Sequence, residues 1–101
     1  MSDPNYKYNE GSLIKEVKTY IDSTYTQHYA GGPVQPGELM MAIGIGGAYF
    51  TGNIIKYAAR YGKKNGYNRK DLLKIIHYAI MAMADADRTE QPKPDETDER
   101  P

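Results

Sequence analysis

The chain has 101 residues, enough for one domain, and a chain this short buries a modest fraction of its surface, so we expect it to assemble as a homo-oligomer. It contains no cysteine and only two histidines, which excludes disulfides and thiolate metal sites and argues against a zinc site. Its net charge is zero, but residues 56–74 carry seven cations and one anion, which suggests an anionic ligand for the folded part.

The first third of the chain is expected to contain a flexible arm, one helix and a loop. Residues 1–10 are polar and lack the apolar core of a signal peptide. Ser12 is the expected N-cap of a helix over residues 12–24. The apolar residues of this helix recur at helical spacing and are expected to be buried: Leu13, Ile14, Val17, Tyr20 and Ile21. Three glycines and two prolines then predict a loop.

Three further helices are expected after this loop. The second covers about residues 36–45, with Pro36 in its first turn, and ends at the glycines of "GIGG". The third covers about 48–61, and Gly62 is its expected left-handed stop. Asn68 can cap a fourth helix over about 69–87. The apolar residues on one side of the fourth helix are expected to be buried: Leu72, Leu73, Ile76, Ala79, Ile80 and Met83.

These elements define the predicted fold class and domain organisation. No strand alternation or internal repeat is found, so the class is all-α, a small bundle of about four helices. We expect a flexible N-terminal arm (1–10), a single helical nucleotide-binding domain (11–88) and a disordered acidic tail (89–101). No apolar run is long enough to span a bilayer, so we expect a cytoplasmic protein with no membrane partner.

The third helix carries a polar stripe, roughly 100° wide, opposite its apolar side. The stripe combines cations that can bind phosphate, an amide that can read a base edge and a tyrosine that can stack: Asn53, Lys56, Tyr57, Arg60 and Lys64. The fourth helix has a matching polar side: Asp71, Lys74, Tyr78 and Asp85. Two interpretations stay open, namely solvated helix faces or, if the stripes face each other, a basic groove lined by tyrosines.

The segment "GIGGAYFTGNIIKYAARYGKK" has the glycine spacing of a phosphate-binding loop but not its chemistry. No strand precedes Gly47, and Asn53 and Ile54 stand where that loop needs Lys and Ser/Thr. Close backbone packing is the better explanation of Gly44, Gly46 and Gly47. No carboxylate cluster suggests a metal site, and no spacing supports a nucleophile with a histidine and an acid, so we expect no metal and no cofactor. His77 is expected to be structural.

Several of these residues carry a resemblance to a known family. The order "HY", "F-x-G-N-I-I-K-Y-x-x-R-x-G-K-K" and "D-L-x-K-x-x-x-Y" resembles the SaV-like family of small phage proteins over roughly 60 residues. That family includes the T7-type nucleotide kinase, which lacks a P-loop and acts on deoxynucleoside monophosphates. The resemblance implies a phage origin, the cytoplasm of an infected bacterial host, and nucleotide handling by Asn53, Lys56, Arg60, Lys63 and Lys64.

Three functions follow as hypotheses. The first is a binding protein without enzymatic activity that sequesters a nucleotide, for example a cyclic nucleotide used as an immune signal by the host, in a basic pocket lined by tyrosines. The second is a nucleoside monophosphate kinase that uses ATP and Mg²⁺, with Asp71 and Glu38 as candidate metal ligands. The third, nucleic-acid binding, is weaker because the net charge is zero.

The predicted ligand-binding residues come from the polar stripes, the basic turn and the loop before the second helix: Asn53, Lys56, Tyr57, Arg60, Lys63, Lys64, Lys74, Tyr78, His28 and Tyr29. With so small a core, we expect the site at a subunit interface. If Arg60 is a surface residue, Arg60→Ala should abolish ligand binding and change stability by less than about 1 kcal/mol.

Overall fold

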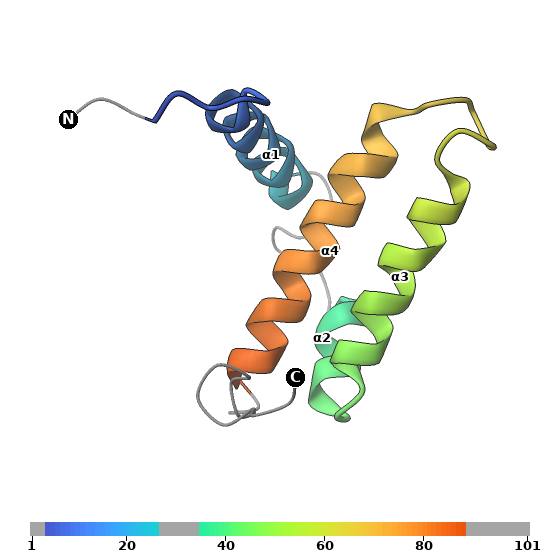
Figure 1. The fold of residues 1–101 in the computed structure, drawn as a ribbon. Helices are drawn as coiled ribbons and strands as arrows, with labels where there is room; N and C mark the ends of the chain where they lie inside the picture. The colour runs from blue at the N-terminus through green and yellow to red at the C-terminus, as the bar shows by residue number, and fades with distance from the viewer. Residues whose placement is uncertain (1–3, 27–34, 89–101) are drawn as a thin grey trace, which may run out of the picture. The chain divides into compact units, whose positions relative to one another are not determined.

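The computed structural model describes residues 4–26 and 35–88 (Figure 1). Within these residues it contains four α-helices and no strand, which confirms the all-α class: α1 (Glu10–Thr24), α2 (Pro36–Ala42), α3 (Gly46–Arg60) and α4 (Arg69–Arg88). The chain divides into two compact units, residues 1–35 and 36–101. The predicted tail (89–101) and two predicted site residues, His28 and Tyr29, lie outside the described residues.

The first unit contains α1, which begins two residues earlier than predicted. Asn9, and not Ser12, precedes the helix, with a left-handed φ of 60° that asparagine tolerates. Its carbonyl accepts the first helical hydrogen bond from the amide of Leu13 at 3.1 Å. The carboxylate of Glu10 accepts a bond from the amide of Tyr8. The predicted burial of Leu13 and Ile14 is wrong, because both side chains are exposed.

The helix α2 begins at Pro36 as predicted but ends at Ala42, three residues before the predicted end. A Schellman motif stops it. Gly44 has φ 88°, its amide donates to the carbonyl of Met41, and the amide of Ile45 donates to that of Met40. The left-handed glycine turns the chain directly into α3, so the predicted role of "GIGG" as a helix terminator is confirmed.

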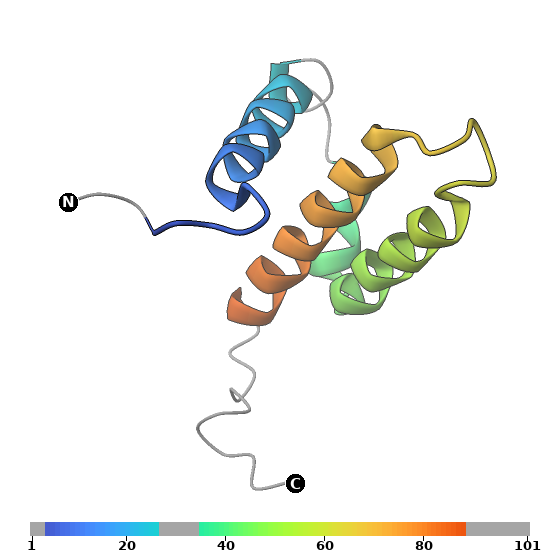
Figure 2. The same cartoon turned by 45° about the horizontal axis from the view of Figure 1, so that its top comes forward.

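An antiparallel hairpin of α3 and α4 forms most of the second unit, and the two helices lie side by side in both views (Figures 1 and 2). Gly62 has φ 86° and ends α3 as predicted. Asn68 caps α4 as predicted, because its side-chain oxygen accepts a hydrogen bond of 2.9 Å from the amide of Lys70. Asp71, in the first turn, suits the positive end of the helix dipole.

The interior of the second unit is small. Phe50 is the only buried large apolar side chain among the residues described, and its ring lies near those of Tyr49 and Tyr78. Gly37 brings α2 against the same ring, because a Cβ there would lie 3.0 Å from it. This core lies at the end of the hairpin far from the turn, while the turn end has the edge-on contact of the Tyr61 and Tyr67 rings, 5.3 Å apart, and the ion pair of Arg60 with Asp71.

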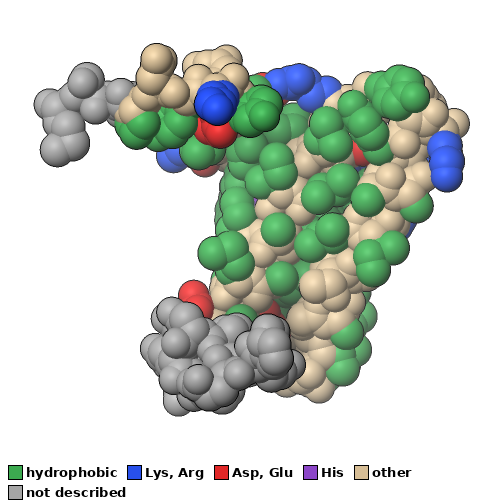
Figure 3. All heavy atoms as spheres, viewed as in Figure 1, with side chains coloured by type: hydrophobic (Ala, Val, Ile, Leu, Met, Phe, Trp, Pro, Cys, Tyr) green, Lys and Arg blue, Asp and Glu red, His purple; other side chains and the backbone are tan. Residues whose placement is uncertain are grey.

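The predicted burial of the apolar side of α4 is wrong for four of its six residues. The side chains of Leu72, Ile76, Ile80 and Met83 are exposed. The polar side of α4 faces α3 instead, as its contacts with Tyr57 and Arg60 show. Hydrophobic side chains consequently appear on the surface of this unit in Figure 3. Among the described helices, none has the length and apolar character needed to cross a membrane.

Candidate functional site

The turn between α3 and α4 determines which residues of the two helices meet. Arg60 and Asp71 are equally distant in sequence from the midpoint between Asn65 and Gly66, and so are Tyr57 and Lys74. Both pairs are in contact across the hairpin. The two polar stripes predicted from the sequence therefore face each other, and they meet near the turn.

Arg60 and Asp71 form the ion pair of this region. Nε of Arg60 lies 3.2 Å from Oδ1 of Asp71, whose side chain is 1% exposed, while that of Arg60 is 28% exposed. The approach does not have hydrogen-bond geometry, and Oδ2 of Asp71 is buried without a hydrogen-bond partner among the described residues. A buried carboxylate is costly unless a cation balances it, so Arg60 is the charge that makes this position of Asp71 tolerable.

Tyr57 lies at the centre of a group of cations. The Nζ atoms of Lys56 and Lys74 lie 5.1 Å and 5.0 Å from the centre of its ring, and Cζ of Arg60 lies 5.9 Å from it. Tyr78 stacks on the same ring, with centroids 6.0 Å apart and planes 14° apart. These distances fall in the range of cation–π attraction, so the ring holds three cations together that would otherwise repel.

We call Lys56, Tyr57, Arg60, Lys74 and Tyr78 the tyrosine–cation cluster. The structure thus brings together five of the ten residues predicted to bind ligand. Asn53 lies one turn before Tyr57 on α3, and its side-chain amide donates to the carbonyl of Tyr49 at 2.9 Å. That bond uses one of the two N–H donors of the amide and fixes its orientation, and the side-chain oxygen can accept a hydrogen bond from a ligand.

The two lysines after α3 are placed differently. Lys63 and Lys64 are exposed in the turn, and both of their amides donate to the carbonyl of Arg60, at 2.9 Å and 3.1 Å. They follow the left-handed Gly62. They therefore add positive charge next to the cluster and are outer residues of any anion site there.

Asp71 is the residue of this site that the sequence does not place correctly. The sequence suggests a residue on a solvated helix face or a ligand for Mg²⁺, whereas the structure buries Asp71 against Arg60. Glu38, the other candidate ligand, belongs to α2, which packs near Phe50. Phe50 and Arg60 are about 15 Å apart along α3, so Glu38 and Asp71 lie at different ends of the hairpin. Equal distance from the turn is the signal that could have identified Asp71 as the partner of Arg60.

The predicted close packing of the glycine-rich segment is confirmed for Gly46 but is wrong for Gly44, where a Cβ would meet no atom within 4 Å and the left-handed φ of 88° is what calls for glycine. A Cβ on Gly46 would lie 2.7 Å from Oδ1 of Asp85 and 2.9 Å from Cγ of Met41. The buried carboxylate of Asp85 thus sits against the first residue of α3, where the helix dipole favours a negative charge. Gly47 has ordinary contact with the same carboxylate at 3.5 Å. Across residues 4–26 and 35–88, no three acids or histidines gather as they would around a metal ion.

His77 lies outside the cluster and is buried. Burial lowers its pKa below the usual 6.5, because the imidazolium would lose its hydration. The neutral form is therefore the one that the fold accommodates. This agrees with the predicted structural role of the residue.

Comparison with known proteins places the chain in a family but assigns it no activity. The model of a family described as "Protein of unknown function (DUF3310)" matches residues 23–80, which is more than half of the chain and includes α3 and most of α4. All the residues of the tyrosine–cation cluster lie within the matched span. No match was found among curated proteins or among solved structures.

Proposed function

The chain belongs to the DUF3310 family, and we propose that it binds and sequesters a nucleotide through the tyrosine–cation cluster. The observation that carries the proposal is the convergence of Lys56, Arg60 and Lys74 on the ring of Tyr57. The ligand class that suits it best is a cyclic nucleotide of the kind used as a host immune signal. The resemblance to small phage proteins supports this choice, because such a protein would meet the immune signals of its host in the cytoplasm of the infected bacterium.

The charge of the cluster supports an anionic ligand. Its three cations are opposed by one carboxylate, that of Asp71, which leaves an excess of two positive charges. A cyclic dinucleotide carries two phosphodiester charges and would balance that excess. Cations held within 6 Å of one ring contribute more free energy to phosphate binding than isolated surface lysines do. Their side chains are already partly ordered, so they lose less conformational entropy when the ligand binds.

The orientation of Arg60 supports the same proposal. Asp71 approaches its Nε, so the two terminal nitrogens of the guanidinium can bind a phosphate. Tyr57 and Tyr78 add aromatic faces, and stacking on a base is worth about 1–3 kcal/mol per base. The oxygen of Asn53 would accept a hydrogen bond from a base or a ribose.

A binding assay with chemical analysis of the ligand tests the proposal. The full chain is titrated with cyclic dinucleotides, nucleoside monophosphates and a short oligonucleotide, then heated, and the released ligand is chromatographed. Tight binding of a cyclic dinucleotide that is recovered intact is the expected result. Conversion of a monophosphate in the presence of ATP and Mg²⁺ would replace the proposal with kinase activity, and binding of the oligonucleotide alone would replace it with nucleic-acid binding.

Two lysine variants locate the site. Lys56→Ala and Lys74→Ala each remove one charged contact, and we expect each to weaken binding about tenfold to hundredfold. Lys70→Ala is the matched control, since this exposed lysine also belongs to α4 but is not one of the cations over the ring of Tyr57. Equal weakening by Lys70→Ala would show that binding depends on overall charge and not on the cluster.

A further inference from the structure

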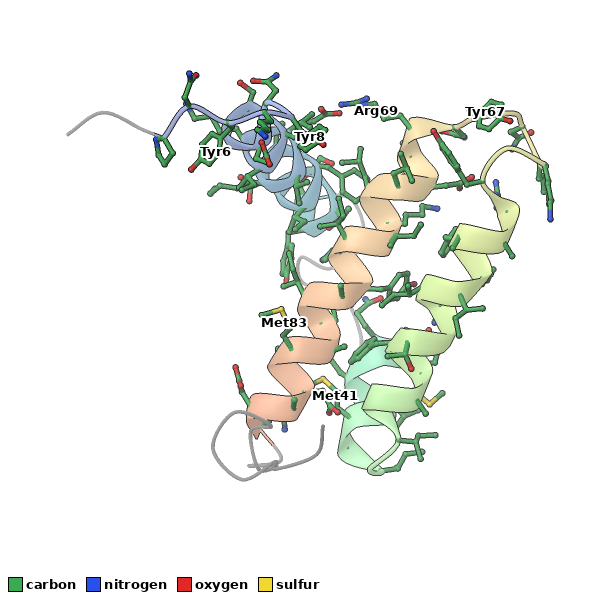
Figure 4. The ribbon with its side chains drawn as sticks, viewed as in Figure 1. Tyr6, Tyr8, Met41, Tyr67, Arg69 and Met83 are labelled. Atoms are coloured by element: carbon green, nitrogen blue, oxygen red, sulfur yellow. The ribbon has the colours of Figure 1, made fainter. Side chains whose placement is uncertain are left out.

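The face of α4 opposite the hairpin carries an uninterrupted apolar stripe. Leu72, Ile76, Ile80 and Met83 follow one another at spacings of three and four residues and are 37%, 41%, 44% and 66% exposed. We call these four residues the α4 apolar face. Figure 4 shows Met83 pointing away from α3. Large apolar side chains in one line on a helix are characteristic of a packing surface.

The interior of the second unit gives a reason for this exposure. Phe50 is the only large apolar side chain that is buried within the part of the chain that the structure describes. The side of α4 that faces α3 carries Asp71 and Tyr78 instead. The largest apolar surface of α4 is therefore not covered by the hairpin of the second unit.

We propose that the α4 apolar face binds the same face of a second copy of this chain, with the two α4 helices antiparallel. The sequence of the face is nearly symmetric about position 78. Ile76 and Ile80 exchange places under a two-fold axis there, and Leu72 comes within one residue of the position opposite Met83. The apolar side chains of one copy thus meet those of the other along the whole face, as a two-fold interface requires.

The charges at the two ends of the face favour this orientation. Arg69 and Asp87 lie on the same side of α4 as the face, and both are exposed. The same axis places Arg69 of one copy beside Asp87 of the second copy, at both ends of the interface. A parallel pairing would instead place Arg69 beside Arg69, which is repulsive.

The size of the face predicts how strong the contact is. Leu72 and Met83 are about 17 Å apart along the helix. Four partly exposed side chains supply less than the ~800 Å² per partner of a standard interface. The dimer is therefore weak, and it dissociates into monomers when the protein is diluted. Because the face lies opposite the tyrosine–cation cluster, this dimer forms with or without ligand and does not place the cluster at the interface.

Sedimentation of the full chain over a range of concentrations tests the interface. The wild type should change from monomer to dimer, and Ile80→Glu should remain monomeric. Ile55→Glu is the matched control, because Ile55 is a 69% exposed isoleucine on α3, and this variant should dimerise like the wild type. A wild type that is monomeric at every concentration, or an equal effect of both variants, would overturn the proposal.

Two further measurements test the orientation. Arg69→Asp and Asp87→Arg should each weaken the dimer, and the double variant should restore it. Because the chain has no cysteine, Leu72→Cys and Met83→Cys introduce unique thiols. The antiparallel dimer separates the two copies of residue 72 by about 18 Å, too far for a disulfide, so only a mixture of both variants should crosslink. Crosslinking of Leu72→Cys with itself would refute the antiparallel arrangement.

Discussion

Replacement of Gly46 by alanine tests the close packing between α3 and α4. The expected effect is the balance of two terms of opposite sign. Alanine is favoured over glycine within a helix by up to about 1 kcal/mol. Against this, the new Cβ would lie 2.7 Å from Oδ1 of Asp85 and 2.9 Å from Cγ of Met41, and overpacking of this kind costs about 1–3 kcal/mol. Neither neighbour is the flexible end of a long side chain, so we expect a net loss of about 1–2 kcal/mol.

Gly52 provides the control for this substitution. It lies on the same helix, is exposed, and has open space where a Cβ would be added, with no neighbouring atom within 4 Å. Gly52→Ala should therefore gain about 0.5–1 kcal/mol from helix propensity alone. The assay is urea unfolding followed by circular dichroism, and a loss of about 1 kcal/mol should also lower the melting temperature by about 4–8 °C.

The two glycine variants must differ in sign for the packing argument to hold. If Gly46→Ala is as stabilising as Gly52→Ala, the contact with Asp85 is not close in solution. The double variant Gly46→Ala with Asp85→Ala sharpens the test. Removal of the carboxylate makes room for the new methyl group, so the double variant should lose less than the sum of the single losses.

Three other substitutions test separate features. Arg60→Ala should cost about 1–3 kcal/mol in urea unfolding, because it leaves the buried Asp71 unpaired, and a loss below about 0.5 kcal/mol would contradict the burial. His77 has a lowered pKa in the folded state, so as the pH falls through 6.5 this imidazole is protonated in the unfolded chain before it is protonated in the folded one. Stability should therefore be fully present above that pH and decrease below it, and His77→Gln should reduce the decrease in melting temperature between pH 8 and pH 5. Gly62→Ala should destabilise more than Gly66→Ala in thermal melts, since both have left-handed φ but only Gly62 also lies against a neighbouring ring; equal losses would contradict this.

Local signals in the sequence were sufficient for the ends of several helices. Asn68 and Gly62 have the roles expected of them, because a cap and a left-handed stop depend on a few neighbouring residues. The start of α1 was predicted incorrectly, and here too a few neighbouring residues decide where the helix begins. Asparagine and serine are about equally favoured as N-caps, so residue type alone does not choose between Asn9 and Ser12. The left-handed Asn9 and the carboxylate of Glu10 organise the turn that precedes Ser12.

The burial of α4 could not be predicted from its periodicity. A hydrophobic stripe identifies a face that would gain from burial, but it does not say which molecule covers it. Here the hairpin brings Asp71 and Tyr78 to α3 and leaves Ile76 and Ile80 exposed. The pairing depends on the length of the turn, which fixes the register between the helices. The same register decides which of the predicted site residues meet.

The register also changes how Arg60 should be used to test function. The expectation that Arg60→Ala leaves stability unchanged rested on a surface position, whereas this side chain balances the buried Asp71. A loss of ligand binding in that variant would therefore be ambiguous, because it could follow from a disturbed hairpin. Lys56 is exposed, and its ammonium lies over the ring of Tyr57 rather than against a buried carboxylate. Because Lys56 balances no buried charge, its removal should cost little stability. Lys56→Ala therefore separates an effect on binding from an effect on folding, whereas Arg60→Ala does not.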